Sequence, residues 1–483
     1  MIRDLASAIE AGASIETDIL IVGAGPAGIS LALALRGSGR RVLLIEAGGM
    51  QFTASSSHYD AESVGIPYPI AASRQRFFGG TSNHWGGWCR PLDPIDLEEK
   101  PWMPLSGWPL TYEELNRWYP KANDILEIPT QIYDAEGQVA DSALLPFTSE
   151  DSFINRAFRF SPPTRFGDVY GDDLVAASDI HVLIEATLVR IEHEGGRVIA
   201  AHVADPQGGT RRIVTGRMIL ATGGLEVPRI LLHTGTSEKP ALGNEHDWVG
   251  RCFMEHFGYT PGYLMTRAEL RYDLHRPEQD APHIHPILVP GPDLMRRHEL
   301  MNALMTLTPE SADPAFPPRA LESSGLASAI IGMPWRYRLT MVNEQRPNPN
   351  SRVTLGDDRD EFGLRKLRLD WQIDQGDFAS ITRVMGLLSS WLGATGLGRL
   401  QHSRPVSPET TAQLTGGMHH MGTARMSRSA TTGVVDPQCL VHGTENLYIA
   451  SSAVFPTAGY ANPTLTIVAL ALRLAQHLID TKP

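Results

Sequence analysis

Cysteine is scarce in this sequence of 483 residues, which contains only Cys89, Cys252 and Cys439. The three lie far apart and form no Cys-x-x-Cys pair, so neither a disulfide framework nor a zinc site is predicted. The zinc-peptidase motif His-Glu-x-x-His is absent as well. We therefore expect no metal centre.

Long apolar runs and excess basic charge are also missing. Residues 465–475, the longest late apolar stretch, are too few to span a bilayer and include Arg473. Residues 1–16 hold no apolar run of signal-peptide length, and we expect them to be a mobile lead-in. The net charge of −12 disfavours nucleic acid and anionic membranes. These absences predict a cytoplasmic protein, with leaderless export together with a partner subunit as the alternative, and they leave its oligomeric state open.

A glycine-rich turn lies between two short apolar stretches near the N-terminus. Residues 19–22 predict a strand, Gly23-Ala24-Gly25-Pro26-Ala27-Gly28 the turn, and residues 29–35 a helix. Residues 41–45 predict a second strand, which ends at Glu46. Strand, glycine turn, helix, strand and acid in this order form the dinucleotide-binding fingerprint, which a chance glycine loop explains poorly.

Each part of this fingerprint has a physical role. Gly23 permits the tight turn, Gly25 lets a pyrophosphate approach the backbone, and Gly28 lets the helix and sheet pack closely. The helix N-terminus offers free N–H groups and a favourable dipole to the phosphates. Glu46, 18 residues after Gly28, is placed to accept hydrogen bonds from ribose hydroxyls.

Residues 76–88 combine glycines, tryptophans and polar side chains, a composition unsuited to a helix or a plain strand. Glycine allows close backbone approach, the aromatic rings supply walls, and Thr81, Asn83 and His84 supply donors. The pattern favours a loop against a flat ligand. A tight turn with tryptophans in the core is the alternative.

Two further regions predict the rest of the sheet and its surroundings. Residues 217–220 predict a buried strand that ends in glycines before a helix over residues 225–233. Thr111 and Glu114 form a capping box that begins a helix extending to about residue 122. Residues 129–168 show little periodicity, so we expect either a lid or a solvated insertion. Other strands are expected at residues 181–184, 188–191 and 198–200.

The residue pattern over residues 258–400 differs from the pattern on either side of this region. Alternating segments such as residues 337–342 predict an antiparallel sheet over residues 258–400, which we assign to a substrate domain. The segment that follows contains His419 in a His-x-x-Gly-Thr motif. Asn462 suits a helix N-cap, with Pro463 at the first helical position. Strands are also expected at residues 367–371 and 446–450, and helices at residues 378–392 and 464–479.

These motifs resemble those of the glucose–methanol–choline (GMC) family of flavin oxidoreductases over nearly the whole chain. The match is strong in the fingerprint and after residue 416, and weak over residues 129–160 and 259–398, where the family's substrate regions vary. Ser82-Asn83-His84-Trp85 and Ala461-Asn462-Pro463-Thr464 look most like the branch of pyranose oxidases, fructose dehydrogenases and glycoside-oxidising enzymes.

The resemblance implies an α/β fold and FAD as cofactor. A Rossmann-like FAD-binding domain is expected over residues 15–257 and 401–483, with the antiparallel-sheet substrate domain over residues 258–400 between them. FAD contacts are implied at Gly23, Gly25, Pro26, Ala27, Gly28, Glu46, Ala47, Gly79, Gly80, Thr81, Asn83, His84, Gly86, Gly87, Leu188, Ala221, Gly223, Ser452, Asn462, Pro463 and Thr464.

His84 falls on the histidine that carries covalent flavin in pyranose oxidases. However, Asn83 precedes it here, and Gly86 stands where those enzymes have Thr. A noncovalent contact is therefore expected, and a covalent link through His84 is the alternative.

The resemblance places His419 on the family's catalytic histidine and Asn462 on the second active-site position. Alcohol oxidation removes a hydride from carbon and a proton from oxygen. We expect flavin N5 to take the hydride and neutral His419 to take the proton as general base, while Asn462 orients the hydroxyl. His420 could face the substrate, although a packed position is favoured, and we treat His256 as structural.

The sequence thus predicts FAD-dependent oxidation of a CH–OH group in a sugar, glycoside or polyol. A non-sugar alcohol is the alternative substrate. An NAD-linked dehydrogenase is a more distant alternative, because Glu46 would suit NAD equally. A non-catalytic nucleotide-binding module fits poorly with a candidate base. The sequence leaves open which substrate is oxidised and whether O2, a quinone or a dye takes the electrons.

Overall fold

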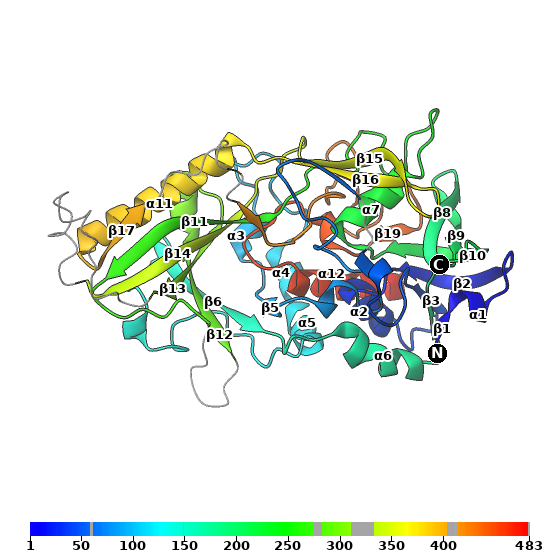
Figure 1. Ribbon diagram of the computed structural model, residues 1–483, viewed down its shortest axis with the longest axis horizontal. Coiled ribbons are helices and arrows are strands. Elements are labelled where there is room, and N and C mark those ends of the chain that lie inside the picture. The colour runs from blue at the N-terminus through cyan, green and yellow to red at the C-terminus, as the bar shows by residue number, and fades with distance from the viewer. Residues whose placement is uncertain are drawn as a thin grey trace.

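The computed structural model describes residues 1–57, 61–147, 149–274, 283–310, 333–402, 411 and 414–481. Residues 275–282 and 311–332, which belong to the predicted substrate domain, lie outside the described residues. The molecule is elongated, and both termini lie at the same end of it (Figure 1).

A sheet of eight strands forms the end of the molecule that carries the termini (Figure 1). Its strands are β1 (Ile2–Asp4), β2 (Ser14–Val22), β3 (Val42–Ile45), β7 (Ile180–Ile184), β8 (Thr187–Glu194), β9 (Arg197–Ala204), β10 (Thr210–Leu220) and β19 (Leu447–Ile449). The order is β1-β7-β3-β2-β10-β9-β8, and β19 also pairs with β10. β2 runs parallel to β3 and β10, and β10 runs parallel to β19. Because parallel strands end at one edge of a sheet, the turns after β2, β10 and β19 converge there.

The predicted strand–turn–helix–strand unit is confirmed by β2, α2 (Pro26–Ala34) and β3. The helix is buried over most of its length because its side chains are small and aliphatic, and α12 (Thr464–Asp480) packs against it (Figure 1). Both helices therefore begin near the edge where the strands end.

The first residues are not the loose lead-in that we expect. β1 pairs in parallel with β7, and Leu5 in α1 (Leu5–Ala8) is completely buried. Three paired residues are too few to leave a periodic pattern in the sequence, so this edge strand escapes prediction.

A second sheet of eight strands forms the other end of the molecule and is antiparallel throughout, as predicted. Its order is β17-β11-β14-β13-β12-β6-β5, with β18 paired to β11. The long helix α11 (Gln375–Thr395) lies along this sheet (Figure 1). The strands are β5 (Trp88–Cys89), β6 (Phe153–Phe160), β11 (His256–Thr266), β12 (Ile284–Pro290), β13 (Ala303–Pro309), β14 (Trp335–Glu344), β17 (Gly398–His402) and β18 (Thr415–Gly416).

The segment 129–168 is not one irregular stretch, because residues 153–160 form β6 inside this sheet. Phe153 and Phe158 are buried there, and Pro, Asp and Ser on either side hide the strand in the sequence. Whether the rest of the segment acts as a lid stays a prediction.

A small third sheet, β15-β16-β4, joins the two halves along one side of the molecule (Figure 1). It contains β4 (Glu62–Gly65), β15 (Arg352–Arg359) and β16 (Arg365–Trp371). Within the described part of the chain, every helix is too short or too polar to cross a bilayer. The remaining α-helices are α3 (Pro94–Leu97), α4 (Tyr112–Asn116), α5 (Tyr119–Ile125), α6 (Phe166–Ala176), α7 (Gly223–Leu232) and α8 (Pro292–His298).

Candidate active site

A cavity of about 630 Å³ lies at the edge where β2, β10 and β19 end. Its wall includes the residue that follows each strand, namely Gly23, Ala221 and Ala450. The volume falls within the range of about 300–1,000 Å³ that is typical of small-molecule sites. The site thus sits at the carboxyl ends of parallel strands, where open α/β sheets bind their ligands.

Most of the predicted FAD contacts line this one cavity. They are Gly23, Gly25, Pro26, Ala27, Glu46, Ala47, Gly80, Thr81, His84, Gly86, Leu188, Ala221, Gly223, Ser452, Asn462, Pro463 and Thr464. Gly28, Gly79, Asn83 and Gly87 are not part of the lining.

These four residues shape the wall from outside it. A Cβ at Gly28 would lie 1.9 Å from the carbonyl oxygen of Gly23, so glycine here allows helix and turn to touch. Gly79 has a left-handed φ of 93°, and the Asn83 amide donates to the Gly80 carbonyl at 2.9 Å, which together hold the turn. Gly87 lies against the backbone of Ser161 in the same way as Gly28 lies against Gly23.

The glycine turn and Glu46 fit the nucleotide part of FAD. A Cβ at Gly25 would meet nothing closer than the Gly80 Cα at 3.9 Å, so space remains above the turn where α2 begins. The Glu46 carboxylate accepts from the N–H groups of Ala24 at 2.9 Å and Gly48 at 3.0 Å, and burial raises its pKa. Thr222, also in the wall, has a buried hydroxyl without a hydrogen-bond partner among the described residues. Open space at a helix N-terminus suits the phosphates of a dinucleotide, and a bound ligand would give the Thr222 hydroxyl a hydrogen-bond partner.

The loop over residues 76–88 was predicted either to lie against a flat ligand or to be a tight turn with tryptophans in the core, and the structure shows features of both. Trp85 and Trp88 line the cavity, as a ligand wall would. Trp85 also donates to the Thr164 carbonyl at 3.0 Å, and Trp88 packs on Phe160 with ring centroids 4.9 Å apart. His84 lines the cavity too, and its pKa is lowered by burial and by nearby Arg165.

His419 and Asn462 meet in the cavity wall. The Asn462 Nδ2 atom lies 3.2 Å from Nε2 of His419. Asn462 is not the helix cap that the sequence predicts, because α12 begins one residue later, with Pro463 as its N-cap residue. The Pro463 carbonyl accepts from the N–H of Ile467 at 2.8 Å, and the Asn462 side chain is directed to His419 instead.

His256 contacts His419 directly, although the sequence suggested only a structural role. The two Nδ1 atoms are 2.9 Å apart, and the His256 side chain is almost completely buried. Its Nε2 lies 2.9 Å from the carbonyl oxygen of Gly459 and 3.3 Å from that of Ala458. The sequence separates the two histidines by 163 residues, so no local pattern could have paired them.

Glu255 fixes the backbone around both histidines. Its buried carboxylate accepts from the N–H of His256 at 2.8 Å, from the N–H of His419 at 2.9 Å, and from the Tyr68 hydroxyl. It therefore ties the start of β11 to the segment that carries His419. Glu255 and Tyr68 were not predicted from the sequence as parts of the site.

Burial keeps the histidines of the site uncharged at neutral pH. It lowers the pKa of His419 well below the usual range and that of His256 to about 4. It also lowers the pKa of His420 to about 3. The His420 ring packs against Tyr68 and Phe253, with centroids 5.5 and 6.2 Å away, as the favoured interpretation predicts, yet it also lines the cavity.

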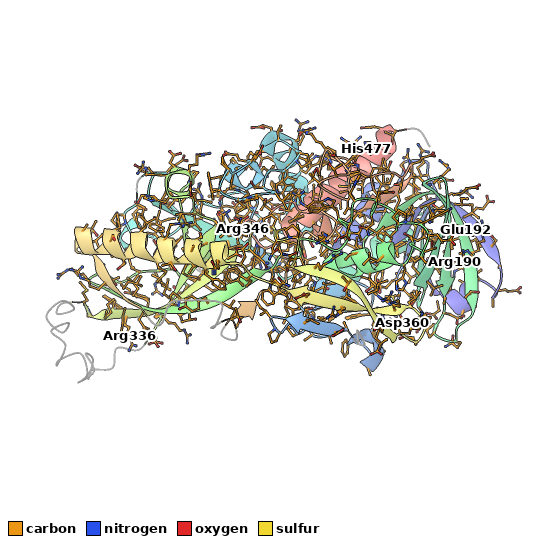
Figure 2. The ribbon with its side chains drawn as sticks, turned by 90° about the horizontal axis from the view of Figure 1, so that it is seen from above. Arg190, Glu192, Arg336, Arg346, Asp360 and His477 are labelled. Atoms are coloured by element: carbon orange, nitrogen blue, oxygen red, sulfur yellow. The ribbon has the colours of Figure 1, made fainter. Side chains whose placement is uncertain are left out.

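The hairpin between β15 and β16 closes the cavity on another side, which the sequence did not indicate. Asp360, labelled in Figure 2, lines the cavity and accepts from Arg229 of α7 at 2.6 Å. Arg229 also donates to Glu226 at 2.6 Å, and all three side chains are mostly buried. This ion-pair network joins the hairpin to α7, the helix that follows β10.

Comparisons with known proteins agree with this architecture. Residues 18–240 match the family model described as FAD dependent oxidoreductase, and residues 347–471 match the model described as GMC oxidoreductase. The fold and the site thus define an FAD-dependent oxidoreductase. The chain carries the C-terminal domain of the GMC oxidoreductases, a family of enzymes that act on CH–OH groups, as its motifs predict. Since that family uses FAD, the NAD-linked alternative is set aside.

Two relatives and one solved structure illustrate the similarity. The 2-methyl-1,2-propanediol dehydrogenase of Mycolicibacterium austroafricanum is 22% identical, over 96% of this chain and 95% of its own. The C-glycoside 3-oxidase of Microbacterium trichothecenolyticum is 26% identical, over 85% of this chain and 76% of its own. A fungal aryl-alcohol oxidase shares the fold with a TM-score of 0.59 at 17% identity, over 96% and 99% of the two chains.

Proposed function

We propose that the protein oxidises a CH–OH group of a sugar, glycoside or polyol, with His419 as the general base. The observation that carries this proposal is the 3.2 Å approach of Asn462 Nδ2 to His419 Nε2 in the wall of the cavity that also holds the glycine turn. FAD supplies a hydride acceptor when it is bound.

The protein's own side chains handle the hydroxyl group in this reaction. Neutral His419 takes the hydroxyl proton on Nε2 as the C–H bond breaks. Asn462 donates its amide N–H to the hydroxyl oxygen and so orients the alcohol. Because burial keeps His419 unprotonated, the base is ready at neutral pH.

The cavity lining supports a substrate with several hydroxyl groups. It includes hydrogen-bonding side chains such as Ser73, Gln75 and His84, and it also includes the flat rings of Trp85 and Trp88. One relative oxidises C-glycosides by name, which supports the same class. A small non-sugar alcohol is the second candidate, because another relative is named for 2-methyl-1,2-propanediol. Residues 258–400 are the region that we propose sets this choice.

Anaerobic mixing with a panel of alcohols tests the substrate class. We expect glycosides, sugars or polyols to bleach the flavin band near about 450 nm faster than simple alcohols do. For each active sugar, the analogue lacking the oxidised hydroxyl is the control and should leave the flavin oxidised. Bleaching by small diols alone would favour the second candidate, and no bleaching by any alcohol would contradict the proposal. Reoxidation by O2 or by a quinone then identifies the acceptor.

We also propose that FAD is held without a covalent bond. His84 lines the cavity, but it is the residue pattern around it that departs from the covalent enzymes. Acid precipitation should release the yellow colour into the supernatant. Colour that stays in the protein pellet, and is lost in a His84→Ala variant, would establish the covalent alternative.

A further inference from the structure

Two histidines from distant parts of the chain meet through their Nδ1 atoms. His256 begins β11, and His419 follows β18; the two nitrogens are 2.9 Å apart, with the ring planes at 83°. A hydrogen bond between two ring nitrogens requires that one donates and the other accepts. The contact therefore fixes where the protons of both rings lie.

The surroundings of His256 decide the direction of this bond. Its Nε2 faces the carbonyl oxygens of Gly459 and Ala458, at 2.9 and 3.3 Å. Carbonyl oxygens can only accept, so Nε2 carries a hydrogen. Burial lowers the pKa of His256 to about 4, so at neutral pH the ring has a single ring proton. Its Nδ1 is therefore an acceptor.

His419 must then donate from its own Nδ1 to His256. Because burial also keeps His419 neutral, its Nε2 is left unprotonated, and this is the nitrogen beside the Asn462 amide. We infer that His256 is a positioning residue that sets the tautomer of His419 and so places the basic lone pair on Nε2. The inference rests on the proposed role of His419 as the base.

The arrangement gives a consistent proton balance. When the substrate O–H bond breaks, its proton moves to Nε2 of His419, and the hydride leaves with its electron pair to FAD. His419 then holds two ring protons, and the Nδ1–H remains bonded to His256. His256 itself gains and loses nothing, so its contribution is the orientation and tautomer of His419. In serine proteases, loss of the residue that sets the histidine tautomer costs about 10⁴-fold in rate.

The backbone around the pair is held independently of the rings. Glu255 accepts from the backbone N–H groups of both histidines, at 2.8 and 2.9 Å. A variant at position 256 can therefore change the ring contact while the two chain segments stay tied together. This makes side-chain substitution a direct probe of the ring contact.

Asparagine and glutamine form a matched pair of substitutions at this position. The amide of asparagine stands about where Nδ1 of histidine stands, so His256→Asn retains an acceptor for the Nδ1–H of His419. The amide of glutamine reaches about as far as Nε2, so His256→Gln retains the contact with Gly459 but lacks that acceptor. We expect His256→Asn to reduce flavin within about tenfold of the wild-type rate. His256→Gln should reduce flavin about 10²–10⁴-fold more slowly than the wild type, with the dissociation constant for substrate nearly unchanged.

Nitrogen NMR of the FAD-loaded protein with ¹⁵N-labelled histidine gives a readout that does not depend on turnover. The signals of His419 are assigned by their loss in His419→Ala. We expect a protonated Nδ1 and a bare Nε2 in the wild type and in His256→Asn, and a shift toward protonated Nε2 in His256→Gln.

Two results would overturn the inference. One is a protonated Nε2 on neutral His419 in the wild type, which decides the matter even if neither variant folds. The other is a normal rate in His256→Gln with a slow His256→Asn, which would assign His256 to the Gly459 contact alone. Failure of the proposed function is distinguishable, because His419→Ala would then reduce flavin normally whatever tautomer the spectra show.

Discussion

His419 is the side chain whose removal should stop proton abstraction while the cofactor stays in place. Alanine at this position deletes the proposed base but leaves the glycine turn and Glu46, which also line the cavity. We expect His419→Ala to retain FAD and to reduce it about 10²–10⁴-fold more slowly. Stopped-flow bleaching and the flavin-to-protein absorbance ratio measure both effects. The exposed His181 on β7 supplies the control His181→Ala, which should behave like the wild type. Near-normal bleaching by His419→Ala would remove it from the base role.

The pH dependence of the same step follows from the environment of His419. Burial, and next the proximity of His256 and His420, lower its pKa well below the usual range. A general base works in its unprotonated form, so the rate should be constant at neutral and alkaline pH. The rate should fall only at pH values below the ordinary histidine pKa of about 6.5. Flavin reduction measured from about pH 5 to 9 tests this, and a midpoint above about 7 would be inconsistent with a buried neutral base.

His419 and Asn462 could be predicted as site residues because both lie in short motifs. The contact of His256 with His419 could not be predicted, since hydrogen bonds between residues far apart in sequence leave no periodic trace. The direction of the Asn462 side chain could not be predicted either, because the sequence also favours a helix cap at this position. Both roles are chemically suitable for an asparagine, and only the structure shows that its amide is directed to His419.

Gly25, in the turn after β2, and Gly28, in the first part of α2, should have different effects when they are replaced. A Cβ at Gly28 would lie 1.9 Å from the Gly23 carbonyl oxygen, whereas one at Gly25 meets only the Gly80 Cα at 3.9 Å. We expect Gly28→Ala to destabilise the apoprotein by about 1–3 kcal/mol or more through overpacking. Gly25→Ala should unfold like the wild-type apoprotein but bind FAD more weakly, because its methyl group enters the space above the turn. Urea unfolding of both apoproteins and FAD titration measure these effects. Equal apoprotein stability in the two variants would contradict this account of the turn.

Many secondary-structure elements could be predicted because their patterns are local. The capping box at Thr111 and Glu114 is present, with the Thr111 side chain accepting from the Glu114 N–H at 3.2 Å. The helix that it begins is shorter than expected, because Pro120 has no N–H to continue it and a new helix, α5, starts at Tyr119. β1 and β6 could not be predicted for other reasons, since β1 has only three residues and Pro, Asp and Ser residues flank β6.

The arrangement of the two sheets around one cavity depends on contacts between distant parts of the chain. The alternation in residues 258–400 predicts an antiparallel sheet but not its strand order, in which β6 and β5 from the first third of the chain join β12. Likewise, the cavity wall brings residues 22–27 together with residues 462–467. These contacts form only in the packed fold. The sequence could therefore indicate the segments that carry site residues, but not that these segments lie side by side.

Because the cavity wall joins both ends of the chain, ligands that fill different parts of it should stabilise the protein differently. A ligand that binds only the native state at 100 times its dissociation constant stabilises by about 2.7 kcal/mol. At equal concentrations, we expect FAD to raise the urea midpoint of the apoprotein more than ADP does, because ADP lacks the part that we expect near Asn462. Gly25→Ala should weaken the effect of both ligands. Asn462→Ala should weaken the stabilisation by FAD and leave the stabilisation by ADP unchanged. If this variant weakened the stabilisation by both ligands equally, the flavin end of the cavity would not be where His419 and Asn462 lie.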